Sequence, residues 1–289
     1  RMVEKGIFEY YDVEVKRNII DQNFNFKEFK LTKVQKIAFE EIKIKFSQNK
    51  NVLFKGVTSS GKTEIYISLI NELLNSKNQI LFLVPEIALT TQLVERLKIY
   101  FAKNLVVYHS GLNINQRAEL WNEIIKNKKP QVIIGARSAV LLPYNKLKLI
   151  IVDEEHEQSY KQYEPSPRYH ARDAALMLGN IHNSNVILGS ATPSLESFYN
   201  SKISKKLSLV ELNSRFGNIP LPKIELINLS DKVKNGKMYG LFSDDLLKRI
   251  KHVVDNKKQV ILFQNRRGYS PVLECNSCGH SPKCINCDV

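Results

Sequence analysis

The chain has 289 residues, of which 43% are hydrophobic and 25% charged, and its formal net charge at pH 7 is +14. This length suits one large domain or two smaller ones, and the composition is that of a soluble globular protein. The apolar runs are no longer than strands, and residues 1–5 are of mixed charge, which argues against a membrane span and a secretory signal.

The predicted elements alternate between strands and helices from residue 32 onward. Before that point, residues 6–15 alternate like a strand and a polar stretch to Lys30 is typical of a linker. Because the chain begins with arginine, we expect a piece of a longer protein. Strands are predicted at 51–55, 79–84, 105–108, 131–135, 147–152 and 185–189, and helices from Thr32, after Lys62, after Ile87, and around 116–127 and 171–179. The alternation predicts an α/β fold, a parallel sheet with helices on both faces.

The last third of the chain is less regular. Residues 201–237 include Pro220 and Pro222 and are predicted to be a connector. A helix over 243–255 and a strand over 259–263 then indicate the start of a second α/β unit.

The strongest local pattern is the segment 56–63, Gly-Val-Thr-Ser-Ser-Gly-Lys-Thr, which fits the phosphate-loop motif G-x-x-x-x-G-K-[ST]. It follows a predicted strand and opens a predicted helix, as the motif requires. The backbone N–H groups of such a loop point at phosphate oxygens, and the helix N-terminus adds partial positive charge. Lys62 is expected to reach the outer phosphates and Thr63 to ligate Mg²⁺. A chance turn before a helix is the alternative.

The second pattern is the acidic run 153–156, Asp-Glu-Glu-His, directly behind the apolar run 149–152. Asp153, at the tip of a strand beside the phosphate loop, is expected to hold Mg²⁺, and Glu154 to orient and deprotonate the attacking water. Alone, the run would more simply be a solvated acidic loop. Beside the phosphate loop it makes Lys62, Asp153 and Glu154 the predicted catalytic residues. The residues expected to bind ATP and Mg²⁺ are Gln35, Gly56, Val57, Thr58, Ser59, Ser60, Gly61, Lys62, Thr63 and Asp153.

A series of segments, in order along the chain, resembles superfamily 2 helicases, and within them the family of the bacterial primosomal replication-restart helicase PriA. The segments are 57–66 (VTSSGKTEIY), 83–92 (LVPEIALTTQ), 109–112 (HSGL) followed by Arg117 and Trp121, 135–139 (GARSA), 153–157 (DEEHE), 189–197 (GSATPSLES) and 262–269 (LFQNRRGY). The chain departs from the family in the loop 159–173, which contains Pro165 and Pro167, and it lacks most of the second helicase lobe and the N-terminal DNA-binding region.

The resemblance implies an ATP-dependent 3′→5′ DNA helicase of replication restart with a RecA-like P-loop NTPase fold. It implies a monomer in the bacterial cytoplasm that acts on single-stranded and forked DNA with primosome proteins and single-stranded-DNA-binding protein. It divides the chain into the tail of a winged-helix-like domain and a linker (1–29), the ATP-binding lobe (30–200), a connector (201–242), the start of the second lobe (243–274) and an incomplete zinc segment (275–289).

The candidate DNA contacts come from the loop after the acidic run. The positive net charge favours polyanions, although a solvated lysine-rich surface would give the same balance. The loop interleaves Tyr160, Tyr163 and Tyr169 with Lys161, Arg168 and Arg172. Aromatic faces stack on bases and cations follow phosphates, and in the resemblance this loop couples single-stranded DNA to ATP hydrolysis. Packing of the tyrosines on the lobe is the alternative. Arg137 and Ser138, at a strand end, are further expected phosphate contacts.

Three polar residues are expected to couple the nucleotide site to DNA. Ser190 and Thr192 lie in the Ser-Ala-Thr segment, for which a polar turn that caps a helix is the simpler interpretation. For His156, a switch contact to the other lobe and a plain loop residue both stay open.

The four cysteines form two C-x-x-C pairs with zinc-knuckle spacing, Cys275 with Cys278 and Cys284 with Cys287. A single four-cysteine Zn²⁺ site is sterically possible but tight. The resemblance implies instead two zinc ions, each shared with a later pair that this chain lacks. We therefore expect that this segment is poorly ordered, lacks native zinc, or binds one ion in an improvised way.

Two other functions stay open. One is a nucleotide-binding module that is not catalytic here, because superfamily 2 enzymes complete their site with arginines of the second lobe, expected beyond Val289. We therefore expect weak ATP binding and little hydrolysis by this chain alone. The other is a zinc-dependent nucleic-acid-binding module with a degenerate ATPase, against which intact Lys62, Thr63, Asp153 and Glu154 argue.

Overall fold

The computed structural model of the protein describes residues 30–74, 77–85, 91–109 and 111–263. The chain divides into two compact units, with the boundary between Pro220 and Leu221. The expected strand at 6–15, the linker and all four cysteines lie outside the described residues. In the part of the chain that is described, no helix is long and apolar enough to cross a membrane.

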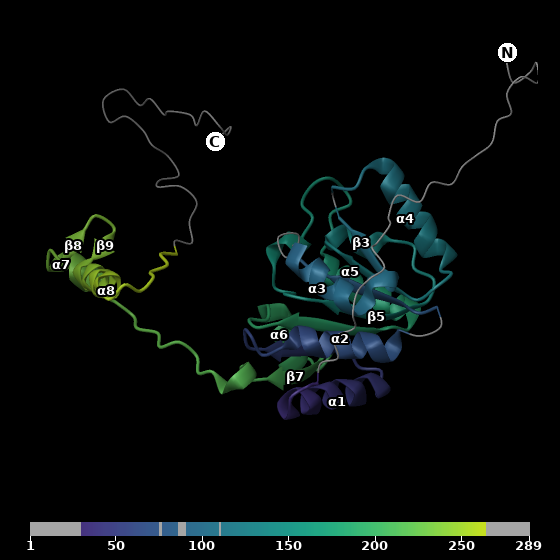
Figure 1. The fold of residues 1–289 in the computed structure, drawn as a ribbon, viewed down its shortest axis with the longest axis horizontal. Coiled ribbons are helices and arrows are strands. Elements are labelled where there is room, and N and C mark those ends of the chain that lie inside the picture. The colour runs from purple at the N-terminus through teal and green to yellow at the C-terminus, as the bar shows by residue number, and fades with distance from the viewer. Residues whose placement is uncertain (1–29, 75–76, 86–90, 110, 264–289) are drawn as a thin grey trace, which may run out of the picture. The chain divides into compact units, whose positions relative to one another are not determined.

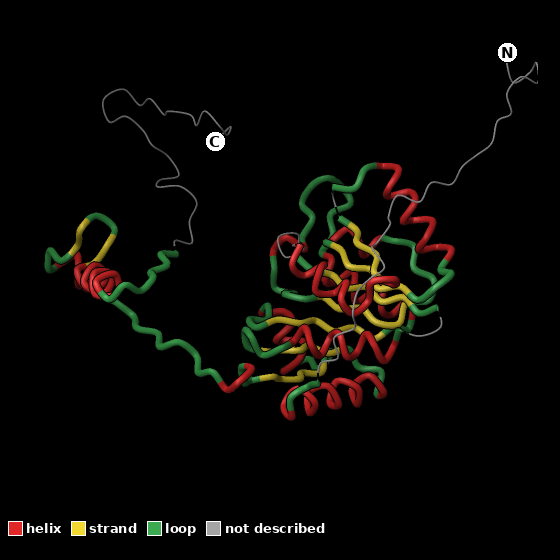
Figure 2. The backbone as a smooth tube through the Cα atoms, viewed as in Figure 1, coloured by secondary structure: helices red, strands yellow, loops and turns green. Residues whose placement is uncertain are grey.

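The first unit is built on a seven-stranded sheet in which every pair of neighbours is parallel (Figures 1 and 2). The order of the strands is β3-β4-β2-β5-β6-β1-β7. Their bounds are β1 (Val52–Gly56), β2 (Gln79–Leu83), β3 (Leu105–Tyr108), β4 (Gln131–Gly135), β5 (Leu147–Val152), β6 (Asn185–Ser190) and β7 (Ser208–Leu212). The parallel pairing confirms the predicted α/β sheet. As a result, the carboxyl ends of β1, β5 and β6 lie side by side at the same end of the strands.

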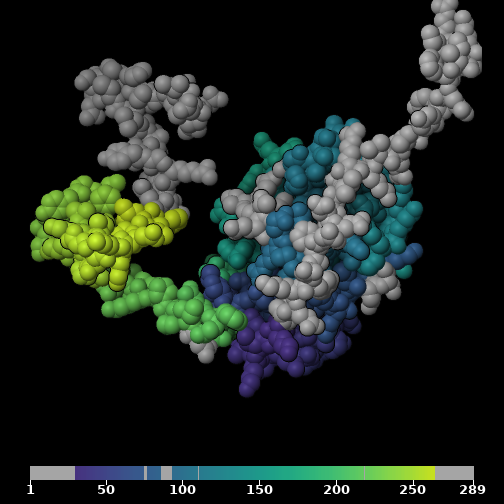
Figure 3. All heavy atoms as spheres, viewed as in Figure 1, coloured from purple at the N-terminus to yellow at the C-terminus, as the bar shows by residue number. Residues whose placement is uncertain are grey.

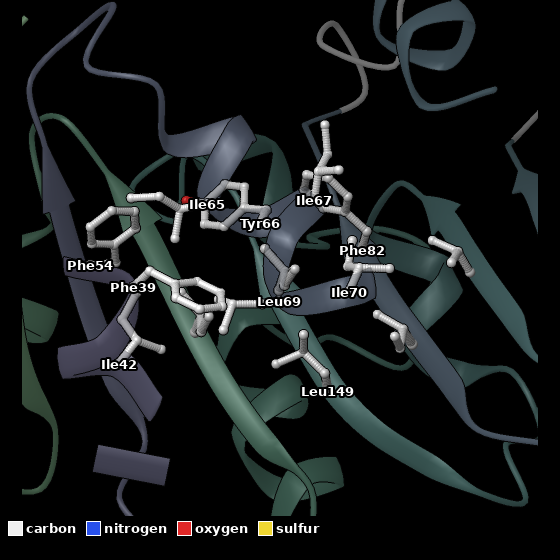
Figure 4. Close-up of a cluster of buried hydrophobic side chains, with 14 of the residues drawn as sticks. Phe39, Ile42, Phe54, Ile65, Tyr66, Ile67, Leu69, Ile70, Phe82 and Leu149 are labelled. Atoms are coloured by element: carbon white, nitrogen blue, oxygen red, sulfur yellow. The ribbon is translucent and has the colours of Figure 1, made fainter. Parts of the chain in front are cut away.

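Helices cover both faces of this sheet. They are α1 (Lys33–Ser47), α2 (Lys62–Leu73), α3 (Thr91–Phe101), α4 (Ile114–Lys126), α5 (Ala171–His182) and α6 (Leu195–Lys202). Alternate strand residues bury on opposite faces: Phe54 packs in one apolar cluster and Leu53 in the other. The first cluster includes α1, α2 and α3 (Figure 4), and the second includes α4 and α5. In the space-filling view, the described residues of this unit form one closely packed body (Figure 3).

Local sequence explains why the helices begin where they do. Thr32 caps α1 and forms a reciprocal capping box with Gln35, and Asn113 does the same for α4 with Gln116. The first turn of α2 instead starts from Gly61, whose φ of 88° is in the left-handed region that favours glycine. The phosphate-loop glycine therefore sets the direction of α2.

The structure differs from the expected connector at 201–242. Residues Ser208–Leu212 form β7, which pairs with β1 at the sheet edge and packs against α1 (Figure 1). Glu211 is exposed and Ser208 and Leu209 are half-buried, so β7 lacks the continuous apolar run of the central strands, as suits a strand at the edge of the sheet. The first unit thus extends past the boundary expected at residue 200.

The second unit contains α7 (Leu229–Lys234), the antiparallel pair β8 (Met238–Tyr239) and β9 (Phe242–Ser243), and α8 (Asp244–Asp255). The helix predicted at 243–255 is confirmed as α8. The strand predicted at 259–263 is wrong, since these residues have no regular structure. An apolar run becomes a strand only where another strand pairs with it, and among the described residues none pairs with this run.

Candidate nucleotide site

The phosphate-loop segment connects the carboxyl end of β1 to the start of α2. Its backbone is fixed by hydrogen bonds from the Val57 N–H to the Leu212 carbonyl at 3.1 Å and from the Ser60 N–H to the Val57 carbonyl at 3.1 Å. Gly61 has a φ of 88°, which strains any residue with a Cβ, and that Cβ would also lie 2.0 Å from Gln35 Nε2. The loop is therefore held in one shape by its neighbours β7 and α1.

A cavity of about 560 Å³ opens over this loop. Its lining comes from the loop, from the end of β5 and from three more segments of the first unit. The lining residues are Lys30, Gln35, Thr58, Ser59, Ser60, Gly61, Lys62, Thr63, Glu64, Arg96, Asp153, Glu154 and Phe216. All the residues predicted to bind ATP and Mg²⁺ line it except Gly56 and Val57, which lie at the root of the loop.

Lys62 and Glu154 face each other across the cavity. The Lys62 ammonium donates a hydrogen bond to the Gly56 carbonyl at 3.0 Å and lies 4.0 Å from Glu154 Oε1. Glu154 has a φ of 49°, a left-handed conformation that is uncommon for a residue with a side chain. The turn that follows β5 thus directs the Glu154 carboxylate toward the Lys62 ammonium. The distance of 4.0 Å is longer than a hydrogen bond, so the two groups are only loosely paired.

Asp153 is half-buried beside this pair. Tyr66, one turn into α2, donates its hydroxyl to Asp153 Oδ1 at 3.1 Å. The pKa of Asp153 is raised to about 6, first by burial and then by the neighbouring Glu154 carboxylate, while Lys62 and the Tyr66 hydroxyl oppose the shift. A bound cation would relieve this excess of negative charge.

The donor set fits Mg²⁺. The ion prefers oxygen ligands and keeps several waters, and Thr63 and Asp153 offer a hydroxyl and a carboxylate in the same cavity. A Cβ on Gly189, the neighbour of this site on β6, would lie 1.8 Å from the Tyr66 hydroxyl. Glycine at 189 therefore makes room for the tyrosine that orients Asp153.

Gln35 lies under the loop. Its Nε2 donates to the Ser60 carbonyl at 3.1 Å, and its Oε1 accepts from the Thr32 N–H at 2.9 Å. Gln35 borders the cavity, but its amide already fastens α1 to the phosphate loop.

The three predicted coupling residues form one chain of contacts. His156 Nδ1 and the Ser190 hydroxyl are 2.8 Å apart and hydrogen-bonded, and the Thr192 N–H donates to the same hydroxyl at 2.9 Å. Glu154 Oε2 lies 3.7 Å from His156 Nδ1. The end of β5 is thus linked to the end of β6 through polar side chains.

Glu155 is a residue that the sequence did not single out. Its carboxylate is fully buried and accepts four hydrogen bonds, from the Ser194 N–H at 2.7 Å, the Ser197 hydroxyl at 2.8 Å, the Ser194 hydroxyl at 3.1 Å and Arg172 Nη1 at 3.2 Å. We call Glu155, Arg172, Ser194 and Ser197 the buried carboxylate cluster. It joins the turn after β5 to the start of α5 and of α6.

Two expected DNA contacts are wrong, because their side chains are buried inside the lobe. Tyr160 is fully buried, and its hydroxyl donates to the Asp153 carbonyl at 2.7 Å, so its ring has no face open to a base. Arg172 is buried in the cluster and pairs with Glu155 and Asp173. Both residues stabilise the lobe from within.

The other expected DNA contacts lie at or near the surface. Tyr163 is 67% exposed, Arg168 is exposed, and Lys161, Tyr169 and Ser138 are half-buried. Arg137 Nη1 donates to the Ser159 carbonyl at 3.3 Å and the Lys161 carbonyl at 3.4 Å, so it holds the base of the loop. Their contact with DNA stays a prediction.

The zinc prediction also stays untested, because Cys275, Cys278, Cys284 and Cys287 lie outside the described residues. Within the ranges that the structure describes, no three histidine, cysteine, aspartate or glutamate side chains gather as metal ligands would.

Comparison with known proteins places this geometry in a family. The replication restart protein PriA of Bacillus subtilis (strain 168) is 38% identical over 292 residues, which cover 100% of this chain and 36% of that protein. PriA of Haemophilus influenzae is 44% identical over 259 residues, which cover 89% of this chain and 34% of that protein. The chain therefore spans about a third of the length of these relatives. A structure of RecG bound to a three-way DNA junction aligns with a TM-score of 0.48 and 21% identity, over 73% of this chain and 27% of that one.

Residues 32–200, more than half of the chain, match the family model of the DEAD/DEAH box helicases. This match begins at the cap of α1 and ends within α6, so it contains the whole cavity except Lys30 and Phe216. The chain belongs to the DEAD/DEAH box helicase family, and replication restart proteins PriA are among its relatives.

Proposed function

We propose that this chain is the ATP-binding lobe of a DNA helicase that acts in replication restart, with 3′→5′ polarity. The observation that carries the proposal is the single cavity that unites the phosphate loop with Lys62, Asp153 and Glu154. The names of the relatives supply the biological setting, and the activity of a whole protein of this kind is part of the proposal.

In this proposal the triphosphate lies along the loop, where backbone N–H groups and the N-terminus of α2 face it. Lys62 exchanges its hydrogen bond to the Gly56 carbonyl for the outer phosphates. Thr63 and Asp153 would hold Mg²⁺, which neutralises phosphate charge when bound. Glu154, held loosely beside Lys62 and His156, orients a water and takes its proton.

Coupling to DNA runs through the contacts at the ends of β5 and β6. Because Glu154, His156 and Ser190 are consecutive neighbours, a movement of Glu154 on nucleotide binding shifts the Ser190–Thr192 segment. On the DNA side, Tyr163 and Tyr169 stack on bases, while Lys161, Arg168, Arg137 and Ser138 contact phosphates. Tyr163 and Arg168 are the exposed members of this set, which supports direct contact.

The partners are single-stranded and forked DNA, primosome proteins and single-stranded-DNA-binding protein, and the location is the cytoplasm. The segment with the four cysteines lacks native zinc or holds at most one loosely bound ion per chain. Metal analysis of the purified chain tests this last point, and two tightly held ions per chain would refute it.

We expect the chain alone to bind Mg·ATP weakly and to hydrolyse it slowly. Among the described residues that line the cavity, Arg96 is the one arginine, and its guanidinium is paired with Glu64. An arginine that stabilises the transferring phosphoryl group is worth about 10³–10⁵ in rate, and this cavity offers none that is unengaged.

The experiment is ATP hydrolysis with and without single-stranded DNA, on the wild-type chain and on Glu154→Gln. We expect nucleotide binding by both and little DNA-stimulated turnover by either. Rapid turnover that Glu154→Gln abolishes would show that the chain needs no further arginine. A chain that binds no Mg·ATP would refute the assignment as an ATP-binding lobe and leave a nucleic-acid-binding module as the better reading.

A further inference from the structure

The segment that leaves β7 runs alongside the phosphate loop. The Val57 N–H donates to the Leu212 carbonyl at 3.1 Å, and the Phe216 N–H donates to the Ser59 carbonyl at 2.9 Å. These two backbone hydrogen bonds fasten residues 212–216 to the two sides of the loop turn. The position of Phe216 relative to the phosphate site is therefore set by the main chain.

The Phe216 side chain borders the nucleotide cavity and remains 65% exposed. Of the described residues that line this cavity, it is the one with an aromatic ring. The rest of the lining is polar or charged and suits the phosphates and Mg²⁺. A nucleotide also carries a flat, largely apolar base, and ligand sites usually give such a group an aromatic or apolar surface.

We propose that Phe216 is the stacking platform for the base of the bound nucleotide. This inference rests on the proposed function, because it takes the triphosphate to lie on the loop from Gly56 to Thr63. The ring then covers one face of the base, and the bond from the Phe216 N–H to Ser59 keeps base and phosphate positions in register.

Stacking has a consequence for specificity. Every nucleobase has a π face, so a stacking ring raises the affinity for nucleotides with little choice among bases. Phe216 thus contributes affinity for ATP and GTP alike, and it contributes none for a ligand that has phosphates and no base.

The test compares Mg·ATP and Mg·GTP with inorganic tripolyphosphate by calorimetric titration. Phe216→Ala should bind both nucleotides about tenfold more weakly, the size of one base–aromatic stack, and tripolyphosphate as well as wild type. Phe263→Ala is the matched control, because Phe263 is 85% exposed and does not line the cavity. It should change none of the affinities.

A second variant reports stacking directly. Phe216→Trp should retain the affinity for ATP, and its indole fluorescence should fall when ATP binds and stay constant with tripolyphosphate, against the constant signal of Trp121, the single tryptophan of the chain.

Equal weakening of ATP and tripolyphosphate by Phe216→Ala would overturn the inference, because the ring would then act by shaping the loop. Unchanged ATP affinity in this variant would overturn it as well. A wild-type chain that binds neither ligand would instead remove the proposed function, and the inference with it.

Discussion

Two neighbouring glutamates at the end of β5 differ in exposure and in the number of hydrogen bonds that they accept. Glu154 is partly exposed and touches its neighbours loosely, 4.0 Å from the Lys62 ammonium and 3.7 Å from His156. Glu155 is fully buried and accepts four hydrogen bonds of 3.2 Å or less. The left-handed turn at Glu154, with a φ of 49°, sends the two side chains to different places.

This contrast distinguishes side chains that are available to bind a ligand from side chains whose hydrogen bonds are satisfied within the protein. Lys62, Asp153 and Glu154 have weak or incomplete partners, and Asp153 has a raised pKa because burial and Glu154 disfavour its charge. The buried carboxylate cluster has satisfied partners and no opening to a ligand. Removing a member of the first set should therefore weaken ligand binding without lowering stability, and removing a member of the second should lower stability.

The largest effect is expected from Arg172→Met, which keeps an unbranched stem in place of the arginine stem and removes the guanidinium charge. Glu155 would then be a buried carboxylate without a cation, which lowers the free energy of unfolding by about 3–5 kcal/mol. Chemical denaturation measures it. The control is Arg168→Met in the same loop, an exposed position that should change stability by less than about 0.5 kcal/mol. Equal effects of the two variants would contradict the internal role of Arg172.

Asp153→Asn should act in the opposite direction. Because the pKa of Asp153 is raised from 3.8 to about 6 in the folded chain, the folded state binds the proton more tightly than the unfolded state does. Ionisation of Asp153 thus costs stability as the pH rises through about 4 to 6, and the cost at pH 7 is about 3 kcal/mol. In EDTA, Asp153→Asn should be more stable than wild type by up to that amount at pH 7 and no more stable near pH 4.

Denaturation curves from pH 4 to pH 7.5 check this prediction. Asp255→Asn, a change of an exposed acid on α8, should leave stability at pH 7 within about 0.5 kcal/mol of wild type. If Asp153→Asn lowered the stability at pH 7, Asp153 would be a structural carboxylate like Glu155.

Smaller effects distinguish two of the three tyrosines of the loop, Tyr160 and Tyr163. Tyr160→Phe removes a buried hydrogen bond to the Asp153 carbonyl and should cost about 1–2 kcal/mol, with unchanged affinity for an oligo-dT strand. Tyr163→Ala should leave stability within about 0.5 kcal/mol and weaken oligo-dT binding about tenfold. Fluorescence anisotropy measures the affinities, and a larger DNA effect for Tyr160→Phe than for Tyr163→Ala would reverse the assignment.

Most of the sheet could be predicted, because its strands are apolar runs buried on both faces. The run 147–152 is an example, and β5 has these bounds. The edge strand β7 was missed because it is partly exposed, with Glu211 between two buried residues. The apolar run 259–263 was misread because pairing depends on a partner that composition does not reveal.

In the candidate site, only the residues that belong to local sequence motifs could be predicted. The phosphate loop and acidic run identify Lys62, Asp153 and Glu154, and the structure brings them to one cavity. Glu155 could not be distinguished from its acidic neighbours in the sequence. Its partners Arg172 and Ser194 lie far along the chain, at the starts of α5 and α6. Phe216 carries no motif, and it reaches the cavity through a backbone bond to Ser59.

The most direct test of the central claim is a titration of Mg·ATP into the wild-type chain and Lys62→Ala. The Lys62 side chain donates to its own loop and lies at a loose distance from Glu154, so the variant should stay folded. We predict Mg²⁺-dependent binding by wild type and at least about a tenfold loss of affinity in Lys62→Ala, as for removal of a charged hydrogen bond. Equal affinity of the two folded proteins would contradict it.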